Sequence, residues 1–97
     1  MTGPVRLAPD AIPRRSIDGR ARRYRGSLLV ANFEQAFELD ELAEFVFRSI
    51  DGTRTVREIG NRLAQRYGLI VEQAVVDTGE LVVELVQHKV LEIDQPI

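Results

Sequence analysis

Apolar and polar residues alternate in the segment that spans residues 33–39. Phe37 and Leu39 fall on one side of an extended chain there, and Glu34 and Glu38 fall on the other. A period of two is typical of a strand with one side turned toward a core. The pattern therefore predicts a strand in this segment.

Two further strands are predicted upstream of it. One covers residues 12–17 and the other residues 22–31, with Gly26 as an interruption. Asp18-Gly19 is a typical hairpin turn between them, and Asn32 marks the turn into the third strand. Because three short antiparallel strands need a cover, we expect helices to supply it.

The rest of the chain follows helical spacing, with clear start signals for two helices. Asp40 is an N-cap candidate for a helix over residues 40–50. Thr55 and Glu58 form a T-x-x-E capping box at the start of a second helix over residues 55–67. These signals predict where both helices begin.

A third helix is predicted over residues 71–88, where the length of the segment without a turn signal outweighs its many β-branched residues. Its core-facing stripe is expected to comprise Val71, Ala74, Val75, Thr78, Leu81, Val82, Leu85 and Val86. Val76, Gly79 and Val83 lie beside this stripe with Glu72 and widen the apolar arc to about twice the width of one buried face. Either another protein element or a ligand should therefore cover them.

Two glycines lie inside the predicted helices. Gly60 borders the apolar stripe of the second helix, where a missing side chain lets another helix come close. Gly79 costs about 1 kcal/mol relative to Ala within a helix, so we expect another backbone to approach there as well.

Together these elements predict an α+β fold, with an N-terminal three-stranded antiparallel sheet packed on a three-helix, winged-helix-turn-helix-like bundle. Ninety-seven residues suffice for one domain. Residues 1–11 include Pro4 and Pro9 and show little periodicity, so a flexible arm is expected before a domain at residues 12–93. Residues 90–93 are expected to add a short terminal strand or an extended tail.

Charge is unevenly distributed along the chain. Residues 1–25 carry seven Arg and two Asp, whereas residues 26–97 carry six basic and thirteen acidic residues, for a formal net charge of −2. Cys is absent, which excludes disulfides and Cys-based zinc sites and gives no sign of an oxidising compartment. The longest apolar run, residues 28–31, is too short to span a membrane or to form a signal-peptide core. A cytoplasmic location is expected, with no membrane partner.

Catalysis finds little support in the sequence. His88 is the single His, Ser residues have no base at a recognisable spacing, and no glycine-rich phosphate loop is present. We therefore expect a binding module that is not an enzyme and holds no metal and no cofactor.

An alternative function is that of a small winged-helix-type DNA-binding regulator. The third helix, however, bears Glu72, Asp77, Glu80 and Glu84. A recognition helix approaches the phosphate backbone, which these acidic residues would repel. The interpretation we prefer includes no nucleic-acid partner.

The segments Leu39-Asp40 and Asp51–Ile59, with a basic strand-like stretch before them and one long apolar helix after them, resemble the PqqD family. Members of that family are peptide chaperones of natural product biosynthesis called RiPP recognition elements, where RiPP denotes a ribosomally made and later modified peptide. The resemblance implies a protein, monomeric or homodimeric, that captures the leader segment of a precursor peptide. It would deliver the remainder to a modifying enzyme, such as a radical S-adenosylmethionine (SAM) enzyme or a leader peptidase.

The resemblance also implies a site, in which the leader adds as a strand to the third strand and its apolar side chains enter a groove beside the third helix. By position, the edge would be provided by Glu34, Gln35, Ala36, Phe37 and Glu38. The groove wall would be provided by Glu72, Val76, Gly79 and Val83. Two alternatives stay open: the two strand glutamates would also protect an edge from aggregation, and the helix residues would also suit more core or a dimer contact.

Arg22, Arg23 and Arg25 form a basic cluster next to Tyr24. Such a cluster could steer an acidic leader toward the site. It could also act as a nonspecific nucleic-acid arm with Tyr24 as a stacking group, or simply be a solvated strand face.

Overall fold

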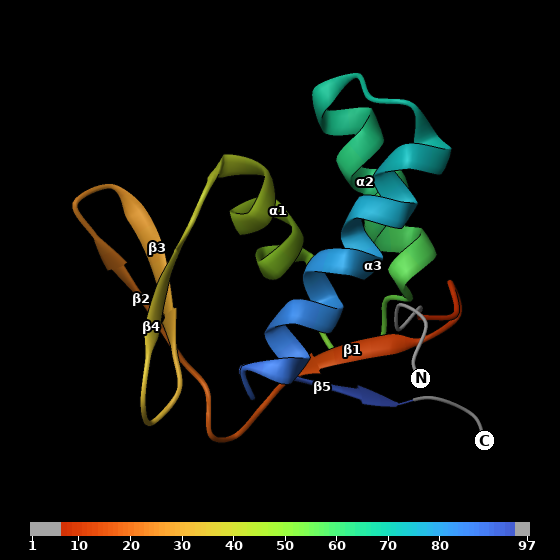
Figure 1. Ribbon diagram of the computed structural model, residues 1–97. Coiled ribbons are helices and arrows are strands. Elements are labelled where there is room, and N and C mark those ends of the chain that lie inside the picture. Colours follow the sequence, from red (N-terminus) through yellow and green to blue (C-terminus); the bar gives the residue numbers. More distant parts are fainter. Residues whose placement is uncertain (1–6, 95–97) are drawn as a thin grey trace, which may run out of the picture.

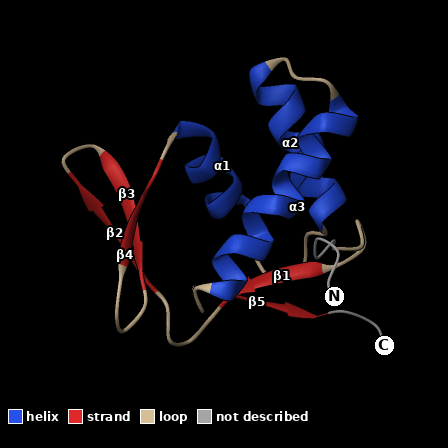
Figure 2. Cartoon of the chain, in the orientation of Figure 1, coloured by secondary structure: helices blue, strands red, loops and turns tan. Residues whose placement is uncertain are grey.

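The computed structural model describes residues 7–94, and its helices form the centre of the molecule (Figure 1). One small sheet lies beside α1, and another lies across the lower ends of α2 and α3 (Figure 2). In chain order the elements are β1 (Ile12–Arg15), β2 (Arg20–Tyr24), β3 (Ser27–Ala31), β4 (Ala36–Leu39), α1 (Glu41–Ser49), α2 (Val56–Tyr67), α3 (Val71–Gln87) and β5 (Leu91–Asp94). The predicted α+β class is confirmed, although the strands form a two-stranded and a three-stranded sheet.

The first two helices begin at the capping residues that the sequence indicated. The backbone N–H of Ala43 donates to Asp40 Oδ1 over 2.8 Å at the start of α1. At the start of α2, Glu58 N–H donates to Thr55 Oγ1 and Thr55 N–H donates to the Glu58 carboxylate, which completes the capping box. Each bond satisfies a backbone donor that has no partner within its helix.

The second and third helices approach most closely at Gly60. A Cβ atom added there would lie 2.7 Å from Val75 Cα, so only Gly allows this packing distance. The expectation for Gly79 was wrong within the described chain. A Cβ at Gly79 would meet only the Val56 side chain, at an ordinary 3.8 Å, and no backbone.

The core fills the space between the helices and the inner faces of both sheets. Its larger members are Leu28, Val30, Leu39, Val46, Phe47, Ile59, Leu63, Val82, Leu85, Val90 and Leu91. The core stripe of α3 is narrower than predicted, because Ala74, Thr78, Val82 and Leu85 are buried while Val71 is exposed. Thr78 carries a buried hydroxyl that lacks a hydrogen-bond partner.

Strand pairing differs from the predicted hairpin at Asp18-Gly19. β1 pairs with β5, near the other end of the described chain, and not with β2. The predicted long strand over residues 22–31 instead folds back on itself. Arg25 and Gly26 both have positive φ angles, of 51° and 83°, as a two-residue hairpin turn requires. β2, β3 and β4 thus form a three-stranded antiparallel sheet.

The start of the described chain lies against α2. The backbone N–H groups of Val56 and Arg57 donate to the carbonyls of Ala11 and Pro9, at 2.9 and 3.0 Å. Residues 1–6 of the expected flexible arm lie outside the described residues.

Candidate functional site

β4 is an edge strand of the three-stranded sheet. It pairs only with β3, with Phe37 opposite Val30 and Leu39 opposite Leu28. No other strand of the described chain pairs with its second edge. Backbone groups on that edge are available to an added strand.

The open edge lies beside the C-terminal end of α3. The Phe37 ring packs on the imidazole of His88, with centroids 4.4 Å apart. The Asn32 side chain, in the turn before β4, donates to the backbone carbonyl of His88 over 2.6 Å. Leu81 precedes His88 by seven residues, or two helical turns, and therefore lies on the same side of α3. His88, at the end of this side of α3, therefore lies next to β4, and Leu81 lies two turns further along the helix.

The expected strand residues divide into two groups. Ala36, Phe37 and Glu38 lie on β4. Glu34 and Gln35 lie before it, and their backbone N–H groups donate to Asn32 Oδ1 at 2.7 and 2.8 Å. Because those donors are already used in a turn, Glu34 and Gln35 do not form the edge of the sheet.

The expected helix residues Glu72, Val76, Gly79 and Val83 lie on a different side of α3 from the one beside β4. The missing side chain of Gly79 faces Val56 of α2. His88 follows Gly79 by nine residues, about two and a half turns at 100° per residue, which places it on the opposite side. The structure therefore does not bring these helix residues and β4 into one groove.

Exposure alone does not separate the two sides of α3, because Gly79 and Val83 are partly buried, as Leu81 and His88 are. Val76 is 53% exposed, whereas Leu81 is partly buried against the core. The sequence pattern assigned Leu81 to the core and gave His88 no role in a site, so it placed neither residue on the side of α3 that lies beside β4. Leu81 and His88 are seven residues apart, or two helical turns, and this spacing is the signal in the sequence that places both on one side of α3.

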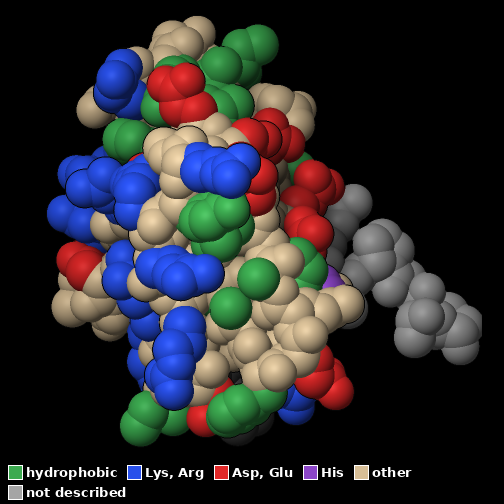
Figure 3. Space-filling model, turned by 90° about the vertical axis from the view of Figure 1, so that its left-hand side faces the viewer, with side chains coloured by type: hydrophobic (Ala, Val, Ile, Leu, Met, Phe, Trp, Pro, Cys, Tyr) green, Lys and Arg blue, Asp and Glu red, His purple; other side chains and the backbone are tan. Residues whose placement is uncertain are grey.

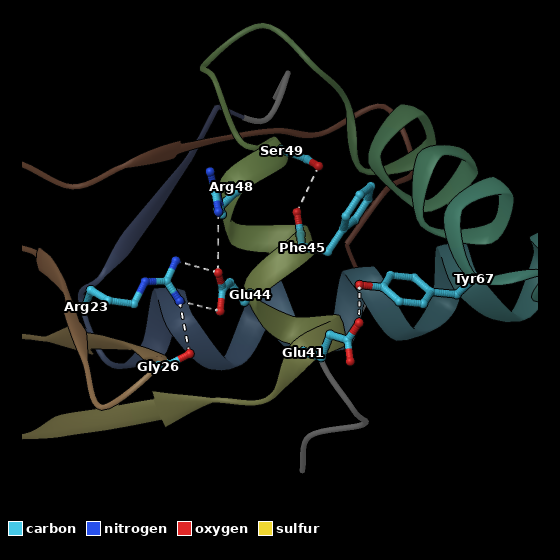
Figure 4. A network of polar contacts seen from close by, with 8 residues as sticks. All are labelled: Arg23, Gly26, Glu41, Glu44, Phe45, Arg48, Ser49 and Tyr67. Carbon is cyan, nitrogen blue, oxygen red and sulfur yellow. Dashed lines mark hydrogen bonds and ion pairs between the residues drawn. The ribbon is translucent and has the colours of Figure 1, made fainter.

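The basic cluster of β2 is also divided. Arg23 is exposed but reaches toward α1, where it donates two hydrogen bonds of 3.1 and 2.7 Å to the Glu44 carboxylate, as Figure 4 shows. These bonds from Arg23 lower the pKa of the Glu44 carboxyl group and raise the pKa of Arg23. Arg22 and Arg25 instead lie over the Tyr24 ring, at 6.0 and 5.3 Å from its centroid. Arg23 thus joins the sheet to α1, while its two neighbours remain on the exposed surface.

Neither a metal site nor a membrane-spanning helix is found in the described part of the chain. No group of three or more His, Cys, Asp or Glu side chains there could hold a metal ion. Among residues 7–94, no helix has the length and apolar character needed to cross a membrane.

Comparison with known proteins decides the family. The profile of the family described as "Coenzyme PQQ synthesis protein D (PqqD)" matches residues 17–91. The chain belongs to the PqqD family. A search of curated proteins found no match.

Two solved structures share the fold of this PqqD-family protein. One is the solution structure of the PqqD part of Methylobacterium extorquens PqqCD, described as a functional and stand-alone RiPP recognition element. It is 30% identical, with a TM-score of 0.71 over 84% of this chain and 88% of that one. The other is TbiB1 in complex with the TbiA(beta) leader peptide, which is 14% identical, with a TM-score of 0.72 over 81% of this chain and 94% of that one. The second likeness concerns the fold alone.

Proposed function

We propose that this protein is a RiPP recognition element, a non-catalytic chaperone that binds the leader segment of a precursor peptide. The observation that carries the proposal is the open edge of β4 beside the His88 side of α3. The 30% identical PqqD structure, described as a functional RiPP recognition element, supports it. TbiB1 was solved with a leader peptide, so a protein of this fold is compatible with such a ligand.

In the proposed complex the leader adds as a fourth strand next to β4. Backbone hydrogen bonds to residues 36–38 provide affinity for any extended peptide, and pockets for alternate side chains provide specificity. Alternate leader side chains would face Leu81, His88 and the Phe37 ring. Leu42, which is 41% exposed in the first turn of α1, extends this apolar surface beyond the end of β4. A leader with apolar residues at every second position fits this surface.

The bound leader would present the rest of the precursor to a modifying enzyme, such as a radical SAM enzyme or a leader peptidase. Arg22 and Arg25, which are exposed on β2 and its turn, remain candidates for attracting an acidic leader. Arg23 is a weaker candidate because its charge is already matched by Glu44.

The charge on α3 argues against the alternative of a winged-helix DNA-binding protein. Glu72, Asp77, Glu80 and Glu84 are all exposed on α3, so a DNA backbone would meet negative charge along that helix. Duplex DNA is nevertheless titrated as a second ligand in the test below.

A matched pair of α3 variants tests the proposed groove. The ligand is the synthetic leader of a precursor peptide encoded beside this protein's gene, titrated by calorimetry, where micromolar to nanomolar binding corresponds to about 8 to 12 kcal/mol. Leu81→Gln should weaken binding about tenfold through lost apolar contact. Val76→Gln, on the other exposed side of α3, should not change it.

Thermal unfolding of both variants checks that each remains folded. A loss of leader affinity with Val76→Gln and not with Leu81→Gln would restore the groove expected from sequence. Tight duplex DNA binding without leader binding would support the regulator instead.

A further inference from the structure

A cleft of about 380 Å³ opens between α1 and α2. Figure 4 shows its two aromatic residues, Phe45 from α1 and Tyr67 from α2. Their rings meet edge to face, with centroids 5.7 Å apart. Arg48, Arg62 and Arg66 also line the cleft. The proposed leader groove uses none of these five residues.

Two arginines of α2, Arg62 and Arg66, lie over the aromatic rings of the cleft. The Arg66 guanidinium lies 4.9 Å from the centroid of Tyr67, and that of Arg62 lies 6.0 Å from the centroid of Phe45. A guanidinium that lies over a ring still has N–H donors on its edge, in the fork geometry that matches a carboxylate. The two arginines are four residues apart on one flank of α2, so they can act on the same ligand.

The carboxylates of the cleft already have partners. Glu44 accepts both bonds from Arg23 and lies 3.5 Å from Arg48. Glu41 accepts a hydrogen bond of 3.1 Å from the Tyr67 hydroxyl, and burial, with this bond, raises the pKa of Tyr67. Within residues 7–94, neither Arg62 nor Arg66 forms an ion pair. The cleft therefore has unmatched positive charge over an aromatic floor.

Figure 3 shows that many Lys and Arg side chains gather toward one edge of the face it presents, whereas most of the Asp and Glu side chains lie toward the other edge. Positive and negative charge are therefore unevenly spread over this face.

We propose that the α1–α2 cleft is a docking site for an acidic segment of a partner protein. A partner Asp or Glu would accept hydrogen bonds from Arg62 and Arg66, while a neighbouring apolar side chain would contact Phe45 and Tyr67. A peptide suits the cleft better than a nucleic acid, because a peptide can place single carboxylates at Arg62 and Arg66 and an apolar side chain on the rings. A continuous chain of phosphates would also bring negative charge close to Glu41 and Glu44, which line the same cleft.

The docking site is formed by α1 and α2, where Phe45 meets Tyr67, whereas the proposed leader groove is centred on β4 and α3, where Phe37 meets His88. Both surfaces could be occupied at once. That the partner is the modifying enzyme rests on the proposed function, but the site itself does not.

The test uses a capped synthetic peptide, Glu-Asp-Phe-Glu-Asp, and its Gln-Asn-Phe-Gln-Asn counterpart. Each is titrated into the full chain labelled with nitrogen-15, and backbone amide shifts are followed by NMR at two salt concentrations. The acidic peptide should shift amides of α1 and α2 around the cleft. The neutral counterpart should bind at least about tenfold more weakly, because charge-assisted hydrogen bonds are lost.

Three variants of α2 make the assignment specific. Arg66→Gln should weaken binding of the acidic peptide about tenfold. Arg66→Lys should weaken it as well, since Lys keeps the charge but loses the planar fork. Arg57→Gln removes the same charge from the opposite flank of the same helix and should leave the affinity unchanged.

Several results would overturn the docking site. These are equal losses in Arg66→Gln and Arg57→Gln, shifts confined to β4 and α3 or to the outer face of β2, and tighter binding of a single-stranded oligonucleotide at the cleft. Leader affinity measured on Arg66→Gln separates this proposal from the previous one. The leader should bind that variant normally, and a protein that binds the acidic peptide at the cleft but no leader would retain the docking site alone.

Discussion

The two small sheets of this protein are joined to the helices in different ways. The β1–β5 sheet pairs residues from opposite ends of the described chain, and Pro13 and Leu91 from it are fully buried. The β2–β3–β4 sheet pairs neighbouring segments. It buries Val30 on its inner face but leaves its outer face exposed, and the Arg23–Glu44 ion pair fastens it to α1.

Because of this difference, the β1–β5 sheet contributes mainly to stability, whereas the three-stranded sheet leaves a surface on which a partner can bind. Pairing between distant segments, with side chains in the core, makes β1 and β5 part of the cooperative unit that the helices form. The three-stranded sheet keeps one edge and one face accessible because it needs only its inner face for attachment. A surface intended for a partner is best placed where it costs the core least.

The largest effect on stability should come from a charge placed in β5, which pairs with β1 from the other end of the described chain. Leu91→Asp places an unpaired carboxylate where the side chain is 1% exposed, at a cost of several kcal/mol, enough to unfold a domain of ordinary stability. Leu29→Asp, on the outer face of β3 opposite Arg22, is the matched control and should cost less than about 1 kcal/mol. Thermal unfolding measures both, and similar melting of the two variants would contradict the division between the sheets.

The next effect concerns the helices that β1 and β5 cover. Gly60→Ala forces a Cβ to within 2.7 Å of Val75 Cα, so α2 and α3 must separate at a cost of about 1–3 kcal/mol. Gly79→Ala should instead stabilise the protein by up to about 1 kcal/mol, because Ala favours the helix and the neighbouring side chain lies at an ordinary distance. Chemical denaturation gives both values. Destabilisation by Gly79→Ala would mean that something fills the space beside it.

A smaller effect is expected from cutting the link between the three-stranded sheet and α1. Arg23→Ala removes the bidentate contact with Glu44, and the β2–β3 hairpin should open more often while the helices stay protected. Hydrogen exchange of backbone amides measures this difference. Arg22→Ala, on the exposed face of the same strand, should leave exchange unchanged, and faster exchange throughout α2 in Arg23→Ala would show that the sheet is not a separate unit.

The smallest expected effect is a loss of stability at low pH that arises from Asp51, in the loop between α1 and α2. Backbone N–H groups of Thr53 and Arg54 donate to Asp51 and, with the Thr53 hydroxyl, lower the pKa of its carboxyl group to about 2. Since the folded-state pKa is depressed, the stabilisation is complete above about pH 4, the pKa range of an Asp in an unfolded chain, and is lost as the pH falls toward about 2. The melting temperature should therefore fall over this window. The decline should be shallower in Asp51→Asn, and an unchanged slope would assign it to other groups.

The sequence was most informative where a structural signal is local. The capping box of Thr55 and Glu58 and the missing side chain of Gly60 each involve a few consecutive residues or a single position, and both predictions were confirmed. Asp40 likewise caps α1 as expected. In these cases the chemistry of the residue determines the local geometry, whatever surrounds it.

The sequence was least informative where distant segments meet. Nothing near Asp18-Gly19 indicates that β1 prefers β5, because the competing hairpin is also chemically reasonable. The helical period of α3 correctly placed Ala74 and Leu85 in the core. It could not show which exposed side of α3 lies next to β4, since that depends on where α2 packs. The strand residues of the candidate site therefore lie on β4 in part, whereas the helix residues expected from the sequence lie on a different side of α3 from the one beside β4.

The pairing of β1 with β5 has a topological consequence. Ile12 is the register partner of Asp94, so the chain enters and leaves the fold at adjacent points and the described domain is nearly a closed ring. Such a ring can be inserted into a loop of a larger protein without stretching either junction. It can also be closed by a short linker and reopened at the Arg25-Gly26 turn. A circular permutant of that kind would keep β4 and the α1–α2 cleft intact while moving both ends of the chain to the tip of the β2–β3 hairpin.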